Sequence, residues 1–473
     1  MLTQLSTTRD ARFPAAAAGL LAVGLIIGLG RRLYGDRAGL LAGAILATNF
    51  GFIFYARRAT ADMETLAGVL AAVWAFERLH LRGSGSWVVG LWVWMAVVSL
   101  TKGLLGFALP IAVFSVFGAW SAWAERGERK WMTALVEENR WFLNRWTFIA
   151  APLGLAIYLL PFLISAQQSG GIGGLEMVWR ENIRRFVVPH NHTGPIYLYV
   201  GVIFVIAAPW AVFLPAALLR PMSTDRGDRL IRAYFWAIFA FFTLSASRRS
   251  YYLLPILPAA SLLIARILSV APDEGPVWAK RLRSFGWWVM AAAALTMSLT
   301  LLPPAWLLPA PYDRLPPLPG RPIIIIVLVL VCVMLWRNSA DRVQCATAIV
   351  FVASLHLFAF VFPELEQYRT RRPFVHLVRD QTAADPRRLG LLHASDTVFD
   401  LGRTAPEFDR PEELIAAIRA GDIRWILGPR KLVVELRPMT SVVAEERSQP
   451  WEIEDQLGNK LILLEANPRK IVP

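Results

Sequence analysis

Long apolar runs separated by short charged segments fill the first three quarters of the chain. Many of these runs approach the roughly 20 residues that an α-helix needs to cross a bilayer. They predict about twelve membrane-spanning helices, some of them shorter than a full crossing. The predicted spans are Pro14–Leu29, Gly39–Tyr55, Met63–His80, Trp87–Leu100, Leu104–Trp123, Trp146–Ser165, Ile196–Leu219, Ile231–Ser245, Tyr251–Val270, Phe285–Leu308, Pro322–Trp336 and Ala346–Phe362.

Beyond Phe362-Pro363 the pattern changes to short apolar runs between polar and turn-forming residues. A helix is expected over Arg410–Ala420, because Pro411 suits a first turn and Gly421 suits a helix end. Residues 366–473 therefore predict a small soluble α/β domain, and residues 1–365 a polytopic α-helical membrane domain. The predicted strands are Leu389–His393, Val398–Leu401, Trp425–Leu427, Leu432–Leu436, Ser441–Glu445 and Leu461–Leu464.

Composition agrees with a membrane location. Hydrophobic residues make up 56% of the 473 residues, and the mean hydropathy is +0.46, which a soluble protein of this length does not need. Several of the tryptophans, such as Trp141, Trp146 and Trp210, lie near predicted span ends, as in an interfacial belt. The net charge of +14 lies mainly in loops, so it indicates membrane topology and anionic lipids rather than nucleic acid.

The distribution of basic residues predicts the orientation of the chain. One set of alternate loops is consistently basic and is therefore placed in the cytoplasm: 31–37, 126–145, 220–232, 280–283 and 337–342. The remaining loops and the C-terminal domain are then expected outside the cytoplasm, at the outer face of a bacterial inner membrane.

Several of the expected outer loops also carry basic residues, against this rule. These basic residues are Arg57, Arg58, Lys102, Arg184, Arg185, Arg248 and Arg249. Tyr252 follows the last pair, and Asp62 lies in the same loop as Arg57 and Arg58. Singly, they have structural explanations: Asp62 can begin a helix and Lys102 can extend to the membrane surface. Together they predict a site for an anionic lipid whose phosphate lies at the outer leaflet.

A metal site is a further possibility in the long loop that follows residue 165. His190 and His192 are separated by one residue, which is compatible with a divalent metal ion but is a weak pattern. No other cofactor is indicated.

These segments resemble the polyprenyl-phosphate-sugar-dependent glycosyltransferases of the membrane C-type (GT-C) fold. The similarity is to the lipid A aminoarabinose transferases and to the protein O-mannosyltransferase-like group, glycosyltransferase family 39. It covers about Arg12 to Pro258 in motifs. The motifs are Tyr55-Ala56-Arg57 with Asp62, Thr101-Lys102-Gly103, Glu181-Asn182 with Arg185-Phe186, His192 and Pro195, Pro209-Trp210, and Arg248 with Tyr252-Leu253-Leu254-Pro255.

The resemblance implies a site and a reaction. It assigns Lys102, Arg185, Arg248 and Tyr252 to the phosphate of the carrier lipid, with arginine at position 248 where the family usually has lysine. The implied reaction is attack of an acceptor hydroxyl on the anomeric carbon of the sugar, with polyprenyl phosphate leaving. The acceptor would be a lipid, such as lipid A in lipopolysaccharide, or a protein.

One departure concerns the N-terminus. The family begins with an additional span and an outer loop that carries an acidic residue, whereas Asp10–Pro14 resembles the entry into the family's second span. We therefore expect the first span and first outer loop to be missing from this sequence. Asp62 is then the remaining candidate for the catalytic carboxylate.

A membrane glycosyltransferase is the function that these features favour. Two alternatives stay open: a carrier-lipid-binding remnant without catalysis, and a transporter of lipids or small molecules. Transporters usually show internal repeats and broken spans. No convincing repeat is present, and the unusual charges gather at one face.

Overall fold

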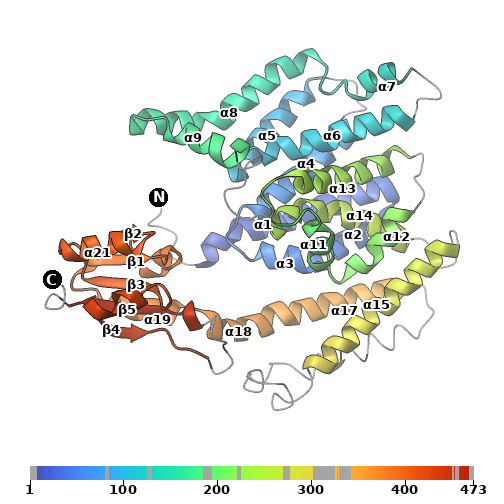
Figure 1. Cartoon of the computed structure of the whole chain (residues 1–473). Helices are drawn as coiled ribbons and strands as arrows, with labels where there is room; N and C mark the ends of the chain where they lie inside the picture. The colour runs from blue at the N-terminus through green and yellow to red at the C-terminus, as the bar shows by residue number, and fades with distance from the viewer. Residues whose placement is uncertain are drawn as a thin grey trace. The chain divides into compact units, whose positions relative to one another are not determined.

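The structure is a computed structural model of the whole chain (Figure 1). It describes residues 8–79, 85–124, 130–184, 194–220, 225–269, 277–301, 325–326, 329, 342–449, 452 and 457–467. Two compact units make up the chain: residues 1–295 with 327–354, and residues 296–326 with 355–473.

The first unit is helical. Its described elements are α1 (Thr8–Tyr34), α2 (Asp36–Thr48), α3 (Phe50–Ala56), α4 (Asp62–Leu79), α5 (Trp87–Lys102), α6 (Leu105–Ala124), α7 (Trp131–Glu138), α8 (Arg145–Ser169), α9 (Gly173–Val178), η3 (Trp179–Arg184), α11 (Leu198–Ile206), η4 (Trp210–Phe213), α12 (Leu214–Leu219), α13 (Arg226–Leu244), η5 (Ser250–Ile256) and α14 (Leu257–Ser269). Two further helices, α15 (Val277–Leu301) and α17 (Arg342–His356), follow, and η8 (Leu357–Val361) continues α17 in the second unit.

Several of these helices can cross a membrane. In the described part of the chain, four are long and apolar enough by length and composition, and two bent helix pairs raise the number to six. The expected count of about twelve also includes shorter and more polar helices, and it stays a prediction. The predicted span Pro322–Trp336 and the end of Phe285–Leu308 lie almost wholly outside the described residues.

Hydrogen bonds connect the two bent helix pairs where each pair is broken. α2 and α3 meet at 63°, and α11 meets the helical segment Trp210–Leu219 at 119°. At the breaks, the Phe50 amide donates to the Ala208 carbonyl (2.9 Å), and the Trp210 indole N–H donates to the Thr48 hydroxyl (2.8 Å). Backbone groups freed by a broken helix need such partners, because hydrocarbon offers none.

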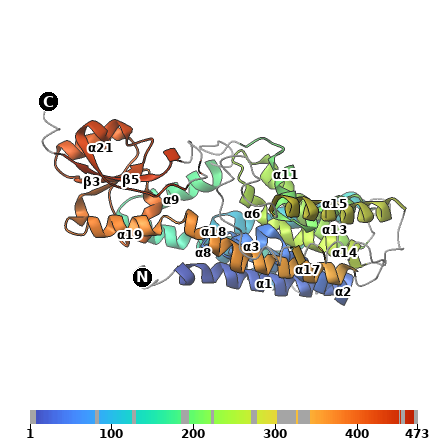
Figure 2. The same cartoon turned by 90° about the horizontal axis from the view of Figure 1, so that it is seen from below.

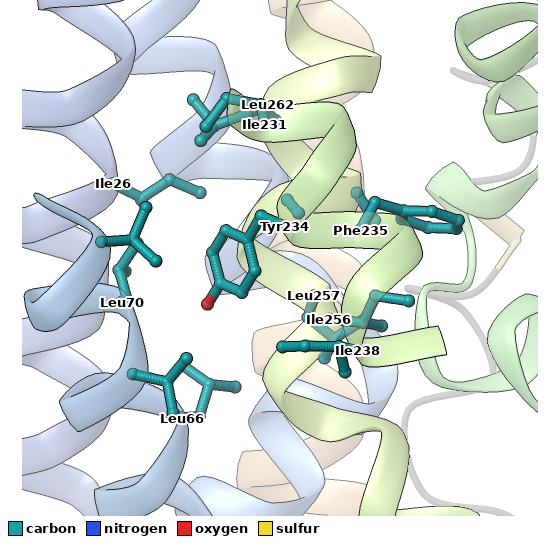
Figure 3. Close-up of a cluster of buried hydrophobic side chains, with 14 of the residues drawn as sticks. Ile26, Leu66, Leu70, Ile231, Tyr234, Phe235, Ile238, Ile256, Leu257 and Leu262 are labelled. Atoms are coloured by element: carbon teal, nitrogen blue, oxygen red, sulfur yellow. The ribbon is translucent and has the colours of Figure 1, made fainter. Parts of the chain in front are cut away.

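A core of buried apolar side chains joins helices α1, α4, α13 and α14 (Figure 3). α1 and α4 contribute aliphatic side chains that face those of α13 and α14 across this core. The residues labelled in the figure are Ile26, Leu66, Leu70, Ile231, Tyr234, Phe235, Ile238, Ile256, Leu257 and Leu262.

The second unit contains a five-stranded mixed sheet in the order β2-β1-β3-β5-β4. β1 pairs in parallel with β2 and β3, whereas β5 pairs antiparallel with β3 and β4. The described elements are α18 (Phe362–Arg369), α19 (Arg372–Gln381), η9 (Pro386–Arg388), β1 (Leu389–Leu392), η10 (Ser395–Thr397), α20 (Val398–Leu401), β2 (Glu407–Phe408), α21 (Pro411–Arg419), β3 (Trp425–Pro429), η11 (Val434–Met439), β4 (Thr440–Glu445) and β5 (Leu461–Ala466).

Helices cover both faces of this sheet. α19 packs on the face that carries Leu391 and Leu463, and α21 packs on the face that carries Ile426 and Leu464. Figure 2 shows these two helices on opposite sides of the strands. Successive strand residues point to opposite faces, so strands covered on both sides read as continuous apolar runs. The prediction of a C-terminal α/β domain is confirmed.

Two predicted strands are wrong. Val398–Leu401 forms the short helix α20, which begins at a turn where the Thr397 hydroxyl donates to the Ala394 carbonyl (2.6 Å) and ends at Gly402, whose φ is +69°. Leu432–Leu436 turns into the 3₁₀ helix η11, whose neighbouring Val433 and Leu436, three residues apart, are both buried in one cluster. Short apolar runs do not distinguish a strand from a helical turn.

The contact between the bent pairs predicts a stability difference between two threonine variants. Thr48→Val leaves the buried Trp210 N–H without its acceptor, so we expect it to cost about 1–3 kcal/mol of unfolding free energy. Thr65→Val is the matched control, because both buried hydroxyls donate to a carbonyl four residues earlier and only Thr48 also accepts from Trp210. Unfolding of the two variants in detergent measures the difference; equal stability would contradict the bond's contribution.

Candidate functional site

An ion pair joins the first residue of α4 to the last residue of α5. The Lys102 ammonium contacts the Asp62 carboxylate, and the two side chains are 24% and 6% exposed. A carboxylate is favourable at a helix N-terminus, and Asp62 begins α4. The fold therefore brings together a predicted phosphate ligand and the predicted catalytic carboxylate, from segments 40 residues apart.

Two tyrosine rings flank the Lys102 ammonium. Its nitrogen lies 5.0 Å from the ring centroid of Tyr251 and 5.4 Å from that of Tyr252. The two rings stand edge to face, with centroids 5.0 Å apart. Cation–π attraction to the two tyrosine rings, added to the ion pair with Asp62, holds the ammonium in one place.

Arg249 adds a second cation to the same cluster. Its Nη1 donates to the Tyr251 hydroxyl at 2.6 Å, so Tyr251 contacts both Arg249 and Lys102. Tyr55 lies next to Tyr251, with ring centroids 6.0 Å apart. The group formed by Asp62, Lys102, Arg249, Tyr251 and Tyr252 is called the Lys102 cluster below.

Arg248 points toward backbone carbonyls. Its guanidinium donates to the Thr243 carbonyl (3.2 Å and 3.0 Å) and to the Gly194 carbonyl (2.8 Å). Thr243 lies in the last turn of α13, so Arg248 caps that helix end and ties it to residue 194. Three donated bonds leave part of the guanidinium donor set available to another acceptor.

Asn182 links η3 to the turn after Lys102. Its Oδ1 accepts from the Leu104 amide (2.8 Å), and its Nδ2 donates to the Val178 carbonyl (2.9 Å). Gly103 has a φ of +68°, and a Cβ there would overlap the Asn182 side chain. Glycine therefore permits both the backbone conformation and the close approach.

The remaining predicted ligands are not part of the Lys102 cluster or lie outside the described residues. Arg58 packs over the Phe54 ring at 4.0 Å, and Arg57 and Arg184 are exposed. Arg185 and the proposed metal pair His190 and His192 lie outside the described residues. Among the residues that are described, no group of three or more histidine, cysteine, aspartate or glutamate side chains could hold a metal ion.

Sequence reasoning underestimated Tyr251 and Asn182. Tyr251 contacts both cations, yet it was indistinguishable from its neighbour Tyr252 in a short aromatic pair. In the sequence, Asn182 stands out only as part of the Glu181-Asn182 motif. The glycine at position 103, which leaves room for the Asn182 side chain, is the sequence feature that points to its contact.

Comparison with known proteins agrees with the motifs. A family model described as dolichyl-phosphate-mannose-protein mannosyltransferase matches residues 2–164. An undecaprenyl phosphate-α-4-amino-4-deoxy-L-arabinose arabinosyl transferase of Pseudomonas fluorescens is 27% identical over 300 residues, covering 61% of this chain and 50% of the relative. The corresponding protein of Pseudomonas aeruginosa strain UCBPP-PA14 is 28% identical over 270 residues, which are 54% of this chain and 45% of the relative.

Solved structures show the same fold. The crystal structure of ArnT from Cupriavidus metallidurans in the apo state superposes with a TM-score of 0.64 at 19% identity, covering 98% of this chain and 84% of that one. The same protein bound to undecaprenyl phosphate gives a TM-score of 0.65 at 17% identity, with 98% and 85% covered.

Fold and comparisons define a mostly helical, multi-pass membrane protein with a C-terminal mixed-sheet domain. The chain is similar in sequence to the aminoarabinose transferases, its residues 2–164 match the protein mannosyltransferase model, and its fold is that of ArnT, in agreement with the resemblance that its motifs predicted. It spans about half the length of the curated relatives that it matches.

The Asn182 contact predicts different outcomes for two glycine variants. Gly103→Ala strains the backbone and displaces Asn182, so we expect a clear loss of thermal stability and a detached η3 segment. Gly170→Ala is the control: Gly170 has a φ of +67°, but no atom lies within 4 Å of the added Cβ. Thermal unfolding and proteolysis in detergent compare the two, and an equal effect would show that only backbone strain matters.

Proposed function

We propose that this protein is a glycosyltransferase of the bacterial inner membrane that uses a polyprenyl-phosphate-linked sugar as its donor. The acceptor would be a lipid, such as lipid A, or a protein at the outer face. The donor named in the curated relatives, undecaprenyl phosphate-α-4-amino-4-deoxy-L-arabinose, makes aminoarabinose the sugar that we favour.

The Lys102 cluster is the observation that carries the proposal. It offers an ammonium packed against two phenol rings, together with a guanidinium and a tyrosine hydroxyl. Cations fixed in this way suit a phosphate, because they need little reorganisation when the charge arrives. Arg248, with donors to spare, and Arg185 would complete the set.

In the proposed reaction, an acceptor hydroxyl attacks the anomeric carbon of the sugar. The bond between that carbon and the phosphate oxygen breaks, and polyprenyl phosphate leaves with the electron pair. Lys102 and Arg249 stabilise the negative charge that develops on the leaving phosphate. The proton of the acceptor hydroxyl passes to a carboxylate.

Asp62 has a second possible role beside that of proton acceptor. Its carboxylate is committed to Lys102, so it can act by orienting the ammonium toward the donor phosphate. The rest of the proposal follows the sequence: about twelve spans, a membrane domain over 1–365, and a domain over 366–473 outside the cytoplasm.

Removal of the Lys102 charge tests the donor site. Lys102→Met should weaken binding of polyprenyl phosphate by about tenfold or more, because a charge-assisted bond is lost. Lys130→Met is the control, since Lys130 is exposed and precedes α7, away from the cluster. Binding to purified protein and transfer of sugar to a lipid acceptor are both measured.

The results separate the site from the function. Equal binding by Lys102→Met and wild type would reject the site assignment. Wild-type protein that binds the carrier without transferring sugar would favour the non-catalytic alternative, and an absence of binding would reject the proposed function.

The role of Asp62 can be read from steady-state kinetics. If Asp62 orients Lys102, Asp62→Asn should raise the donor KM about tenfold and lower kcat less, whereas Asp62→Glu should recover part of the loss. A fall in kcat at unchanged KM, with loss of the acidic limb of the pH profile, would instead identify Asp62 as the proton acceptor.

A further inference from the structure

A second buried charge cluster lies at the opposite end of α13 from the Lys102 cluster. Asp228 is in the first turn of this helix, and Arg248 and Arg249 follow its last turn. The helical segment Ser250–Ser269 is long and apolar enough to cross a membrane; it begins next to Arg249 of the Lys102 cluster and carries Arg266, a member of the second cluster, in its last turn. The two clusters therefore lie at opposite membrane surfaces.

Asp228 is the centre of the second cluster. It is 1% exposed and forms ion pairs with Arg232 (Nε to Oδ2, 3.2 Å) and with Arg266 of α14. The Tyr34 hydroxyl, from the end of α1, donates to Asp228 Oδ1 at 3.5 Å. One carboxylate thus connects three helices.

The Arg232 guanidinium binds Asp228 and three backbone carbonyls. Besides Asp228, its guanidinium donates to the carbonyls of Ala217 (3.4 Å), Leu218 (3.0 Å) and Arg220 (2.9 Å). These are the carbonyls at the end of α12, which lack partners within their own helix. Arg232 therefore has a structural task, and its charge is already balanced by Asp228.

In the residues that the structure describes, the guanidinium groups of Arg220 and Arg266, unlike that of Arg232, donate to no backbone carbonyl. The Arg266 guanidinium lies over the Tyr34 ring at 4.8 Å, and its side chain remains 15% exposed. The half-buried Arg220 guanidinium is close enough to Arg266 to feel its charge: burial first, and then Arg266, lowers the pKa of Arg220. Within the described part of the chain, no carboxylate or carbonyl pairs with the Arg220 guanidinium.

Among the described residues of this cluster, the positive charges outnumber the negative ones. Three guanidinium groups, of Arg220, Arg232 and Arg266, face Asp228 and the more distant Asp225, whose side chain caps α13 by accepting from Gly227 (3.0 Å). The neighbouring Arg226, in contrast, is paired in a bidentate manner with Glu138, at 2.9 Å for both bonds. A like-charged pair held partly out of water is costly unless an anion joins it.

We propose that Arg220 and Arg266, the latter held over the Tyr34 ring, bind a phosphate group at the membrane surface opposite the Lys102 cluster. Arginine forks match phosphate oxygens, and basic pockets between transmembrane helices bind phosphate headgroups. The phosphate comes either from a lipid headgroup in that leaflet or from solution. Binding joins the ends of α1, α12 and α14, so it stabilises the bundle. This inference is independent of the proposed transferase activity.

The test uses full-length protein that carries Lys102→Met, so that phosphate binding at the first cluster does not interfere. Binding of phosphatidic acid, of diacylglycerol without phosphate and of inorganic phosphate is followed by the shift in Tm and by native mass spectrometry. We expect phosphatidic acid to bind and diacylglycerol not to bind. Binding of inorganic phosphate with similar stabilisation would identify solution as a sufficient source.

Variants locate the site. Arg220→Gln should weaken phosphatidic acid binding by about tenfold or more, because a charged donor is lost. Arg281→Gln is the matched control, since it removes one exposed arginine from the start of α15. Equal affinities of Arg220→Gln and Arg281→Gln, or binding of diacylglycerol as tight as that of phosphatidic acid, would overturn the proposal.

Discussion

Polar groups inside an apolar helix bundle must find partners within the protein, and this constraint organises the membrane unit. Where α2 gives way to α3, the freed backbone amide of Phe50 reaches the carbonyl of Ala208 at the other bent pair, and Trp210 reaches Thr48. Each break alone would leave polar groups without hydrogen-bond partners, and the contact between the two breaks supplies those partners. The bent pairs place α3 and its neighbouring loop, which begins with Arg57, at the surface that carries the Lys102 cluster.

The same constraint explains why charge is concentrated in two clusters. Each cluster is built on a buried carboxylate with cations from other helices: Asp62 with Lys102, and Asp228 with Arg232 and Arg266. In each, at least one cation also packs on a tyrosine ring, which holds it without neutralising it. Such an arrangement fixes the cations in place, as the two proposed phosphate sites require.

Homology and geometry contribute different parts of the functional argument. The comparisons relate the chain to the aminoarabinose transferases and give it their fold. The geometry points to individual groups: Tyr251 and Arg249 join Lys102, whereas most of the bonds that Arg248 makes go to the end of α13. The donor site proposed from motifs thus becomes a cluster in which lysine is the central cation.

The sequence by itself determined the membrane class, most of the helices, the strands β1, β3, β4 and β5, and the resemblance to the aminoarabinose transferases, because these depend on apolar length, local periodicity and short motifs. Tertiary structure decided which charges meet. Lys102 and Asp62 are separated by 40 residues, and nothing local in either segment specifies the other. The helical course of Val398–Leu401 was decided in the same way, since a short apolar run takes the conformation that its packing and flanking turns allow.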